Sequence, residues 1–538
     1  MTSGRNGQRA RDAARKVFGH ESLLPGQEEA MSALLDGHDV LLVSPTGSGK
    51  SLTYQVAGVL IEGCTLVVSP LLALQHDQIE GLAENGPDAQ AARISSAETS
   101  SHRERVLARA MAGDVEFVFL SPEQLANPEV RQELAELAPS LVAVDEAHCV
   151  SAWGHDFRPD YFRLGDLLEE IGSPRIIAMT ATAAPPVRED IVERLGMRDP
   201  RTVVTGFERD NIELDVRRAT TARDQQDQVL DAVRAAEEGP AGAGIVYCRT
   251  RRATEEYAAA LEERGHRVAV YHAGLSQKRR AEAYDAFMDD KVDIIVATSA
   301  FGMGIDKPDI RYVVHAQAPE SPDTYYQEVG RAGRDGAPAT ATLVYRPEDL
   351  SLGRFFSAGI PKRADVLAVV RATSALGGTD RHAVQERTGL GPRKTGRILN
   401  LLEQVAETGG RIDAGSKSAD AVTELAQAHR KLQESRVDMM RGYAETDRCR
   451  AEFLLGYFGE RVSGRCGHCD NCLAGVAPEP SSDEDSAFPL HSRVGHEEFG
   501  EGIVTDLEED RLTVLFDDVG YRTLSLKLVE DQGLLEVR

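Results

Sequence analysis

The chain is poor in aromatic residues and in long apolar runs. Only 5% of its 538 residues are Phe, Trp or Tyr, and a single tryptophan is present. No apolar run approaches the roughly 20 residues that a membrane-spanning helix requires. The N-terminal segment is basic but lacks the apolar core of a secretory signal. These absences argue against a membrane protein and predict a cytoplasmic one.

Cysteine and positive charge are also scarce. The seven cysteines are an odd number in a long chain, which argues against a disulfide framework and favours thiol or metal chemistry. With 61 Lys and Arg against 87 Asp and Glu, the formal net charge is −26. Because phosphate binding is largely electrostatic, this charge weakly disfavours a nucleic-acid partner, although a local basic track remains compatible with it.

Short apolar runs rich in β-branched residues alternate with segments of helical length, such as DVLLV, TLVVS and RIIAMT. This order predicts an α/β fold with parallel sheets. The rhythm restarts after residue 208 and stops near residue 349. The predicted domains are two α/β lobes at 1–208 and 209–348, a helical segment at 349–416, a helix with a cysteine cluster at 417–473, an acidic linker at 474–489 and a small β-barrel at 490–538.

The stretch LLVSPTGSGKS is a predicted strand that runs into a glycine-rich turn and then a helix. In this context glycines let backbone N–H groups approach phosphates, Lys50 reaches the β- and γ-phosphates, and the Ser51 hydroxyl ligates Mg²⁺. Ser44 stands where the usual pattern has its first glycine. The alternative is a chance glycine-rich turn. The predicted contacts to ATP in this stretch are Thr46, Gly47, Ser48, Gly49, Lys50 and Ser51.

The stretch VAVDEAH follows on a later predicted strand end. A lone acidic pair there is usually a solvated strand end, but this one accompanies a phosphate loop. We therefore expect Asp145 to hold Mg²⁺ and Glu146 to orient or deprotonate the attacking water.

These motifs resemble those of the superfamily 2 helicases and, within them, the RecQ family. The resemblance covers about residues 15–348 and resumes over about 437–473. Besides TGSGKS and DEAH it rests on VVSPLLALQHDQ, AMTATA, VYCRTR, YHAGL, VATSAFGMGIDKPDIRYVVH, YYQEVGRAGRDG and AHCVSAWGHDFRPDY. It implies two RecA-like lobes with ATP bound between them.

The resemblance also implies that the second lobe supplies cations to the γ-phosphate. QEVGRAGR places Arg331 and Arg334 three residues apart, which we interpret as one helical turn, so that both point at one anion. An arginine finger is typically worth ~10³–10⁵ in rate. Gln327 is expected to contact the nucleotide, and the segment 180–182 is expected to couple hydrolysis to movement.

One departure from the RecQ pattern lies upstream of the phosphate loop. The family sequence is roughly F-G-Y-x-x-F-R-P-G-Q, whose aromatic, Arg and Gln contact adenine, whereas this chain reads FGHESLLPGQ. Gln27 is kept, His20 replaces the aromatic residue and Leu24 replaces the arginine. We expect weaker ATP binding or relaxed base choice, without loss of activity.

A second motif predicts zinc. Cys466, Cys469 and Cys472 form two overlapping C-x-x-C steps, and Cys449 on an earlier helix completes a tetrahedral four-thiolate site. A closed site of this kind is structural, and RecQ enzymes carry a similar zinc platform. His468 is an inferior candidate ligand. The remaining cysteines are expected to pack in the core: Cys64, Cys149 and Cys248.

About 60 residues before the zinc motif have no counterpart in most RecQ proteins. They read as an apolar helix, then DRHAVQERTG, a glycine-containing turn and an amphipathic helix opened by GPRKTGR. This is helix-turn-helix order, with Arg393, Lys394 and Arg397 at the start of the predicted recognition helix. We interpret the segment as a winged-helix-like module that contacts duplex or forked DNA. The alternative is a plain helical spacer.

The C-terminal segment resembles the Tudor-like or SH3-like barrel of UvrD-type helicases through V-x-H-x-x-FG-x-G-x-V and LTVLFDDVG. In those enzymes the module can contact RNA polymerase, so a protein partner is expected here. Its acidic character suits protein better than DNA.

The predicted function is an ATP- and Mg²⁺-dependent DNA helicase of RecQ type that acts in DNA repair and recombination, with 3′→5′ polarity implied by the resemblance alone. Ser69–Leu71, Arg251 and His272 are expected to grip single-strand phosphates. An RNA helicase is one alternative, which the RecQ-specific motifs disfavour. A non-enzymatic recruitment factor is another, disfavoured because Lys50 and the other ATPase residues are intact.

The only tryptophan lies in CVSAWGHDFRPDY, directly after the acidic pair. Polar and charged residues interrupt its aromatic ones, which is unfavourable for burial. Aromatic rings stack on bases for roughly 1–3 kcal/mol each, and an arginine adds stacking or a phosphate contact. We expect this loop to couple single-stranded DNA to hydrolysis through Trp153, His155, Phe157 and Arg158.

Overall fold

The computed structural model describes residues 2–70, 72–83, 89–95, 98–151, 159–302, 305–350, 359–407, 416–460, 464–478, 487–508, 510–517 and 519–538. The chain divides into two compact units. The first contains residues 1–346 and 443–480, and the second contains residues 347–442 and 481–538. The division falls inside one long helix, α19 (Ser416–Glu445), and the predicted domain boundaries stay a prediction.

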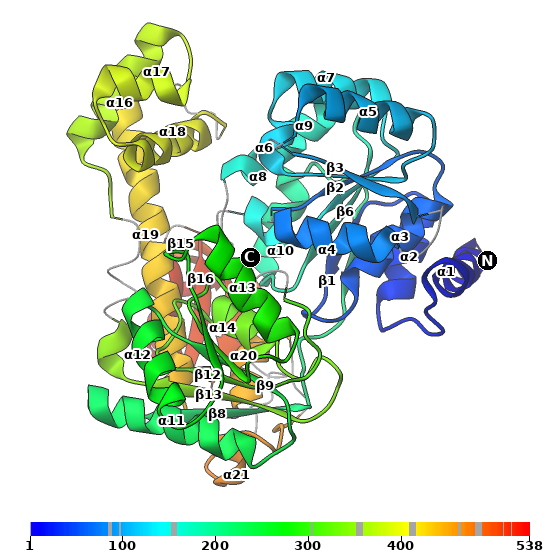
Figure 1. The fold of residues 1–538 in the computed structure, drawn as a ribbon. Coiled ribbons are helices and arrows are strands. Elements are labelled where there is room, and N and C mark those ends of the chain that lie inside the picture. Colours follow the sequence, from blue (N-terminus) through cyan, green and yellow to red (C-terminus); the bar gives the residue numbers. More distant parts are fainter. Residues whose placement is uncertain are drawn as a thin grey trace. The chain divides into compact units, whose positions relative to one another are not determined.

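Lobe 1 contains a sheet of seven strands in the order β3-β4-β2-β5-β6-β1-β7. Every pair of neighbours is parallel, and Figure 1 shows the sheet with helices on both sides. The central strands are apolar and fully buried, as a sheet covered on both faces requires. The strands are β1 (Val40–Val43), β2 (Thr65–Val68), β3 (Ala91–Ile94), β4 (Phe117–Leu120), β5 (Leu141–Val144), β6 (Arg175–Thr180) and β7 (Arg201–Val204).

One face of this sheet packs against the N-terminal helices. Val40 and Leu42 point to the same face because side chains alternate along a strand, and there they join Met31 and Tyr54 in one apolar cluster. The helices of the lobe are α1 (Thr2–Phe18), α2 (Gln27–Asp36), α3 (Lys50–Leu60), α4 (Leu72–Ala83), α5 (Ser100–Met111), α6 (Pro122–Leu125), α7 (Pro128–Leu137), α8 (Pro159–Phe162), α9 (Leu164–Glu170) and α10 (Pro185–Arg194).

Lobe 2 repeats this architecture with six parallel strands in the order β10-β11-β9-β12-β13-β8. Its strands are β8 (Ile212–Arg218), β9 (Ala243–Tyr247), β10 (Val268–Tyr271), β11 (Ile294–Ala297), β12 (Ile310–His315) and β13 (Ala339–Tyr345), and its helices are α11 (Ala222–Glu237), α12 (Arg251–Glu262), α13 (Gln277–Met288) and α14 (Pro322–Val329). The predicted fold class of two tandem parallel-sheet lobes is confirmed.

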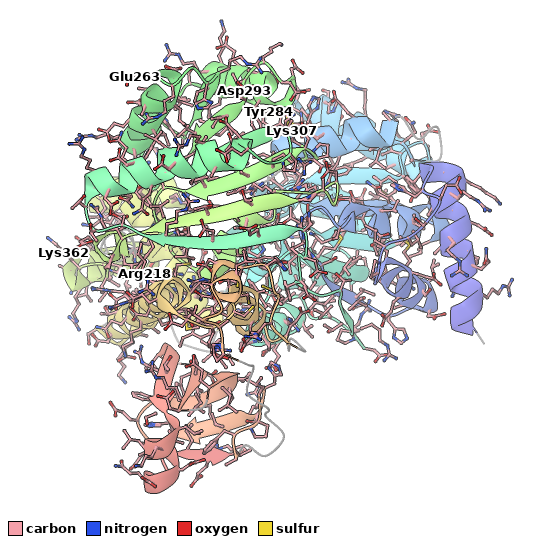
Figure 2. All side chains as sticks on the ribbon, turned by 90° about the horizontal axis from the view of Figure 1, so that it is seen from below. Arg218, Glu263, Tyr284, Asp293, Lys307 and Lys362 are labelled. Atoms are coloured by element: carbon pink, nitrogen blue, oxygen red, sulfur yellow. The ribbon has the colours of Figure 1, made fainter. Side chains whose placement is uncertain are left out.

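Charge in lobe 2 lies mostly at the surface. Figure 2 labels Arg218 and Glu263 there, and both side chains are exposed. Lys307 is an exception, because it is 4% exposed. Its ammonium group lies 2.6 Å from the carboxylate of Asp290 and 3.1 Å from that of Asp309, so a buried cation is paired twice.

The zinc-motif segment of the first unit contains α20 (Arg450–Tyr457) and α21 (Asp470–Leu473). The second unit begins with the three predicted helices, α16 (Arg363–Leu376), α17 (Arg381–Thr388) and α18 (Pro392–Glu407). They enclose an apolar core that includes Val366, Val384 and Ile398. The described residues 359–407 contain no strand, and the place for a wing after α18, residues 408–415, lies outside the described residues.

The C-terminal part of the second unit is a five-stranded antiparallel sheet in the order β17-β16-β15-β14-β18. Its alternating strands enclose a small core with Val494, Val514 and Phe516, as the sequence predicted. The elements are β14 (Arg493–His496), β15 (Gly500–Leu507), β16 (Arg511–Phe516), β17 (Gly520–Ser525), α22 (Leu526–Gln532) and β18 (Leu535–Val537). Among the described residues no helix is long and apolar enough to cross a membrane.

A carboxyl group at the start of β4 makes the stability of lobe 1 depend on pH. Burial raises the pKa of Glu116 to about 7, and its Oε1 atom has no hydrogen-bond partner. A carboxyl whose pKa is raised by folding stabilises the fold fully below its unfolded pKa. This contribution is lost as the pH rises through about 7.

We therefore expect Glu116→Gln to raise the thermal unfolding midpoint at pH 8 and to leave it nearly unchanged at pH 5. Solvent reaches part of the carboxylate, so the expected gain at pH 8 is about 1 kcal/mol, below the ~1.4 kcal/mol that each pKa unit would give at full burial. Calorimetry at both pH values checks this. Glu136→Gln, on the exposed face of α7, is the control, and an equal shift at both pH values would contradict the prediction.

Candidate nucleotide-binding site and metal centre

Three neighbouring strands of lobe 1 end at the same edge of the sheet. The order β5-β6-β1 places Asp145, Thr180 and Ser44 at the carboxyl ends of adjacent strands. In open parallel sheets ligands bind in the crevice at this edge. The topology therefore brings together the phosphate loop, the acidic pair and the segment 180–182, which are far apart in the sequence.

The phosphate loop spans residues 44–49 between β1 and α3. Gly47 and Gly49 adopt φ angles of 81° and 65°, which other residues adopt only with strain. The Lys50 ammonium donates to the carbonyl oxygens of Ser44 and Pro45, at 2.9 and 3.0 Å. The loop thus has the conformation of an anion cradle at a helix N-terminus, and Lys50 lies across it.

Gln27 supports the phosphate loop from outside. Its Nε2 donates to the carbonyl oxygens of Ser48 and Gly49 at 3.0 and 2.9 Å, and its Oε1 accepts from the Leu24 backbone N–H at 2.9 Å. A glutamine amide offers two N–H donors, and both are used here. Gln27 therefore holds the loop to the start of α2.

The acidic pair follows β5. The backbone N–H of Glu146 donates to the Asp145 carboxylate at 3.0 Å, and Glu146 has a φ of 49°. His148 lies 3.4 Å from the Glu146 carboxylate through its Nδ1, which also lies 3.0 Å from the Thr180 hydroxyl. A single buried imidazole thus joins the acidic pair to β6, a link that the sequence analysis did not predict.

The charges in this crevice perturb one another. Burial lowers the pKa of the Lys50 ammonium, an effect that Glu146 and Asp145 oppose and that Arg334 reinforces. Burial raises the pKa of Asp145, and Lys50 opposes that shift. A cation and two carboxylates held in a poorly solvated crevice are typical of a site that binds a charged ligand.

The second lobe contributes Arg331 and Arg334. Their predicted position on one helical turn is wrong, because α14 ends at Val329 and both residues lie in the turns that follow. The two charges nevertheless affect each other, since burial lowers the pKa of Arg334 and the charge of Arg331 lowers it further. The Nε atoms of both are buried without a hydrogen-bond partner. Unsatisfied guanidinium donors of this kind favour an anion between the arginines and the phosphate loop.

Arg334 reaches the phosphate loop itself. A Cβ atom added at Gly47 would lie 3.1 Å from the Arg334 Cγ, so a larger residue there would crowd this side chain. One Arg334 Nη donates to the Asp306 carboxylate at 2.6 Å. Asp306 therefore holds Arg334 in the absence of another anion.

The turns that carry the arginines are fixed by residues that the sequence analysis missed. Arg209 donates to the carbonyl oxygens of Gly330, Ala332 and Gly333 at 3.3, 2.8 and 3.2 Å. Asn211 donates to the Gly333 carbonyl at 2.8 Å. Both precede β8, a strand whose alternating polar residues gave no clear sequence signal.

One hydrogen bond joins the lobes beside the site. Gln327 Nε2 on α14 donates to the Thr182 hydroxyl at 3.1 Å, and the Thr180 hydroxyl donates to the Thr182 carbonyl at 3.0 Å. Gln327 was predicted to contact the nucleotide. In this structure it contacts the segment 180–182, and its role toward ATP stays a prediction.

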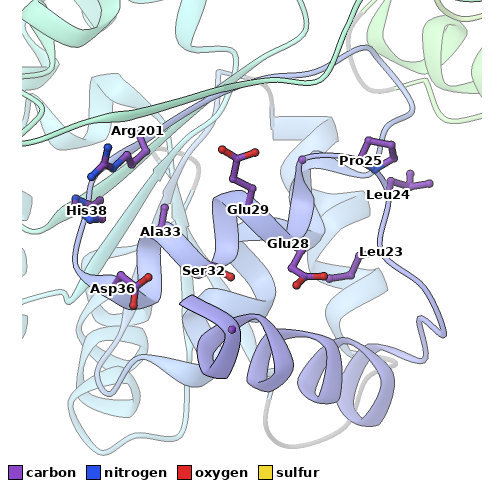
Figure 3. A pocket seen from close by; sticks show the side chains of 12 residues that line it. Leu23, Leu24, Pro25, Glu28, Glu29, Ser32, Ala33, Asp36, His38 and Arg201 are labelled. Carbon is purple, nitrogen blue, oxygen red and sulfur yellow. The ribbon is translucent and has the colours of Figure 1, made fainter. Parts of the chain in front are cut away.

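A second, open cavity of about 870 Å³ lies beside α2 in lobe 1. Figure 3 shows Glu28, Glu29 and Asp36 around it, with Leu24 at its margin. Leu24, which stands where the RecQ pattern has arginine, is uncharged and 48% exposed. Three carboxylates line this cavity together with Arg201 and His38, and no phosphate-loop residue does, so it is separate from the phosphate loop.

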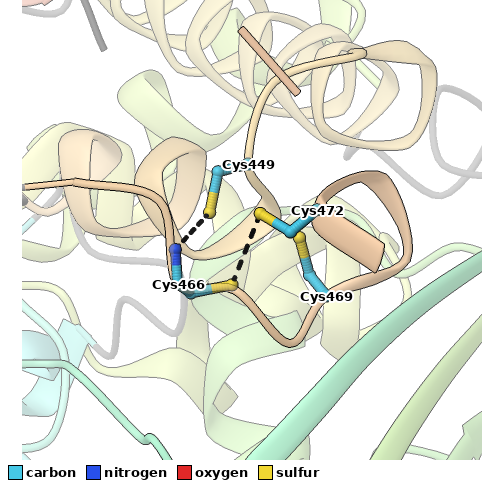
Figure 4. Close-up of side chains that lie close together, drawn as sticks. All are labelled: Cys449, Cys466, Cys469 and Cys472. Carbon is cyan, nitrogen blue, oxygen red and sulfur yellow. Dashed lines mark hydrogen bonds between the residues drawn. The ribbon is translucent and has the colours of Figure 1, made fainter. Parts of the chain in front are cut away.

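The four cysteines of the zinc motif come together in the first unit (Figure 4), and their Sγ atoms all lie within 4.8 Å of one another. Around a tetrahedral zinc ion with Zn–S bonds of about 2.3 Å, sulfur atoms lie about 3.8 Å apart. The Cys466 and Cys472 Sγ atoms are 3.9 Å apart. The backbone N–H groups of Cys466 and Arg450 donate to Cys449 and Cys469 at 3.3 and 3.4 Å, which stabilises thiolates.

These residues fit a structural zinc ion, as the sequence predicted. His468 is not one of the clustered ligands, and its Nδ1 lies 2.7 Å from the Cys466 carbonyl. Cys64, Cys149 and Cys248 are buried and free of disulfides, in agreement with the prediction that they pack in the core.

The predicted single-strand contacts of the lobes lie at strand ends. The Ser69 side chain follows β2 and is buried. His272 follows β10, is 4% exposed and has no hydrogen-bond partner for either ring nitrogen. Arg251 begins α12, and its guanidinium approaches Gly274, where an added Cβ would lie 2.8 Å from its Nη1. Arg251 and the turn after His272 thus meet on lobe 2. Their role toward DNA stays a prediction.

The structure describes only some of the other predicted DNA contacts. Trp153, His155, Phe157 and Arg158 lie outside the described residues. In the second unit Arg393 is exposed at the start of α18, whereas the Lys394 ammonium lies 2.6 Å from the Asp365 carboxylate. Arg393 is therefore the more accessible cation of the predicted pair.

Three segments of the chain match known protein families. Residues 24–191 match the DEAD/DEAH box helicase family, residues 224–336 match the helicase conserved C-terminal domain and residues 410–473 match the RecQ zinc-binding family.

Two relatives match most of the chain. It is 34% identical to the probable ATP-dependent DNA helicase RecS of Bacillus subtilis over 85% of this chain and 90% of RecS. It is also 34% identical to the ATP-dependent DNA helicase RecQ of Pasteurella multocida, over 87% of this chain and 62% of that protein. Among solved structures, the DUF1998 helicase MrfA bound to DNA aligns with a TM-score of 0.52 at 21% identity, over 64% of this chain and 49% of MrfA, which shows a shared fold.

Two parallel-sheet lobes, with a phosphate loop and an acidic pair on the first and paired arginines on the second, define a superfamily 2 helicase. The four-cysteine cluster and the extent of the match to RecS narrow the assignment. The chain belongs to the RecQ family.

The bond between the lobes gives a testable prediction. Thr182→Val keeps the shape of the side chain but removes the acceptor for Gln327. A lost hydrogen bond of about 0.5–1.5 kcal/mol is expected to lower the kcat for DNA-stimulated ATP hydrolysis by roughly 2- to 10-fold, with little change in the KM for ATP. Steady-state kinetics check this. Thr202→Val, at an exposed position on β7, is the matched control, and an unchanged kcat would refute the coupling role.

Proposed function

We propose that this protein is an ATP-dependent DNA helicase that couples ATP hydrolysis between its two lobes to 3′→5′ movement on single-stranded DNA and to duplex unwinding. The observation that carries the proposal is the crevice in which Lys50, Asp145 and Glu146 face Arg331 and Arg334, whose Nε atoms lack partners. The relatives RecS and RecQ are named as ATP-dependent DNA helicases.

ATP enters with its phosphates on the loop 44–49. Lys50 exchanges its carbonyl acceptors for β- and γ-phosphate oxygens, and the loop N–H groups hold the remaining oxygens. Ser51 and Asp145 are the residues that would hold Mg²⁺, which neutralises phosphate charge. The Ser51 hydroxyl already accepts a hydrogen bond from Gln78 at 3.2 Å, which orients it toward the site.

Hydrolysis requires a positioned water and stabilised transition-state charge. Glu146 is the candidate to orient or deprotonate the water, and the His148 Nδ1 atom lies 3.4 Å from its carboxylate. Arg334 leaves Asp306 for the γ-phosphate, while Arg331 supplies a second cation. Because the arginines belong to lobe 2 and already lie beside the phosphate loop, hydrolysis uses groups from both lobes, and opening and closing of the lobes during the ATP cycle is what advances the enzyme along DNA.

The proposed nucleic-acid substrate is DNA rather than RNA. The names of the RecS and RecQ relatives support this choice, and the polarity rests on the resemblance to RecQ enzymes. In the same proposal the enzyme acts in the cytoplasm on intermediates of DNA repair or recombination. A protein partner for the C-terminal sheet, such as RNA polymerase, stays a prediction from the sequence.

We further propose that α16–α18 form a helix-turn-helix module for the duplex part of a fork. α17 and α18 are joined by a turn in which Gly389 has a φ of 68°. Arg381, Arg387 and Arg393 are all exposed on these elements. In a chain of net charge −26, this exposed group of arginines offers the local positive charge that phosphate binding needs.

Lys50→Ala tests the enzyme. It is expected to abolish ATP hydrolysis and unwinding of forked DNA while DNA affinity stays near the wild-type value, because the phosphate loop does not line a DNA-binding surface in this proposal. Fluorescence unwinding assays on 3′-tailed and 5′-tailed DNA, with RNA forks alongside, measure substrate and polarity. A wild-type protein that binds DNA but hydrolyses no ATP would support the recruitment-factor alternative instead.

Arg393→Ala tests the helix-turn-helix module. Loss of one phosphate contact should lower the slope of log affinity against log salt concentration for a fork by about 1, with single-strand affinity unchanged. Fluorescence anisotropy across salt concentrations gives both values. Arg430→Ala, which removes an α19 cation paired with Glu434 at 2.8 Å, controls for net charge. An unchanged fork affinity and slope would leave the segment a helical spacer.

A further inference from the structure

We propose that the zinc-motif segment positions the catalytic arginines, through Phe458 and Tyr457 at the end of α20. This inference rests on the proposed ATPase function. Tyr457 and Phe458 contact α14, the helix that leads into Arg331, so we treat them as positioning residues that act through that helix.

The first support is a set of contacts between α20 and α14, which Figure 1 shows beside each other. The Tyr457 hydroxyl donates to the Asp323 carboxylate. The ring of Phe458 packs against Tyr326 with centroids 5.0 Å apart. Tyr443, in the last turn of α19, donates through its hydroxyl to that of Tyr325 at 3.3 Å. Three residues of α14, Asp323, Tyr325 and Tyr326, thus contact residues between Tyr443 and Phe458.

The second support is the chain that connects the lobes. Phe207 lies in this connection, and its ring stacks on Phe458 at 4.7 Å with an 18° angle between planes. The Phe207 backbone N–H donates to the Glu460 carboxylate at 2.8 Å, and its carbonyl accepts from the Tyr326 hydroxyl at 2.6 Å. Phe207, Tyr326 and Phe458 therefore form one buried aromatic cluster, worth more than its area burial alone.

The third support comes from lobe 1. Arg188 on α10 donates through Nη2 to the Phe458 carbonyl and through Nε to the Ala183 carbonyl, both at 2.8 Å. Ala183 directly follows Thr182, the residue that accepts from Gln327. These contacts form a closed circuit. Thr182 contacts Gln327 on α14, Tyr326 on α14 contacts Phe458, and Arg188 hydrogen-bonds both Phe458 and Ala183, the residue after Thr182.

This circuit fixes the position of α14 relative to the phosphate loop. Gly330 follows α14 directly, and an added Cβ there would lie 3.8 Å from the Thr46 Cβ. The next residue is Arg331. A shift of α14 would move Arg331 without altering the loop that binds ATP. A mutation far from the reacting atoms that misplaces a catalytic group by 1 Å can lower the rate about 100-fold. Phe458 should therefore affect hydrolysis more than nucleotide binding.

The test is Phe458→Leu in the full chain, which removes the ring stack but keeps a large apolar side chain. We expect kcat for ATP hydrolysis to fall roughly 10-fold, with the KM for ATP, the zinc content per chain and single-strand DNA affinity unchanged. Phe458→Tyr keeps the ring and should restore kcat. Phe488→Leu, in the core of the C-terminal sheet, is the matched control and should leave kcat unchanged.

A double-mutant cycle separates positioning from general destabilisation. If Phe458 acts through Arg331, then Phe458→Leu should lower kcat little further in an Arg331→Ala background. Additive losses in the two backgrounds would overturn the proposal, and so would a parallel loss of zinc, DNA affinity and ATP affinity, which indicates a merely structural role. Tyr457→Phe, which removes one hydroxyl, is a milder variant should Phe458→Leu fail to fold, and it should show the same split between kcat and KM.

The outcome is distinguishable from failure of the proposed function. A wild-type protein without ATPase activity would refute the function itself. Wild-type activity together with an unchanged kcat in both Phe458→Leu and Tyr457→Phe would refute only the positioning role.

Discussion

The structure depends on one constraint, which is that a single ligand site is divided between two lobes. Lys50 and the acidic pair lie on the first lobe, and Arg331 and Arg334 lie on the second. Each lobe satisfies its buried charges only in part, because the Nε atoms of Arg331 and Arg334 have no hydrogen-bond partner and burial shifts the pKa of Lys50 and Asp145 away from their ordinary values. A polyphosphate bound in the crevice would contact both sides at once, so binding would favour the arrangement in which Arg334 lies beside the phosphate loop.

Contacts outside the crevice hold in place the segment of lobe 2 that carries Arg331 and Arg334. Gln327 and Arg209 hold the ends of the segment that carries the arginines. The aromatic cluster around Phe458 holds α14 from the side of the zinc-motif segment. The cysteine cluster begins this chain of contacts, because Cys449 is the N-cap of α20 and Phe458 follows its last turn. A structural metal site thereby has a mechanical connection to the catalytic groups.

Sequence patterns predicted the central strands well and the edge strands poorly. Runs such as TLVV and LVAV are buried on both faces, so they must be continuously apolar and are visible in the sequence. The strands that were missed, β3, β7 and β8, lie at sheet edges and carry polar residues, such as Arg201 on β7. The helical turn expected for Arg331 and Arg334 was wrong because α14 ends at Val329 with Gly330 as its C-cap, a local signal that the spacing argument did not use.

By itself the sequence determined the chemistry: the phosphate loop, the acidic pair, the arginines and the four cysteines, because each needs specific residue types at a local spacing. Only the tertiary structure decided which of these groups meet. Strand order brought Ser44, Asp145 and Thr180 to one edge, and packing joined Phe207 to Phe458 across about 250 residues of chain. Such contacts depend on the path of the whole backbone, and no local pattern records them.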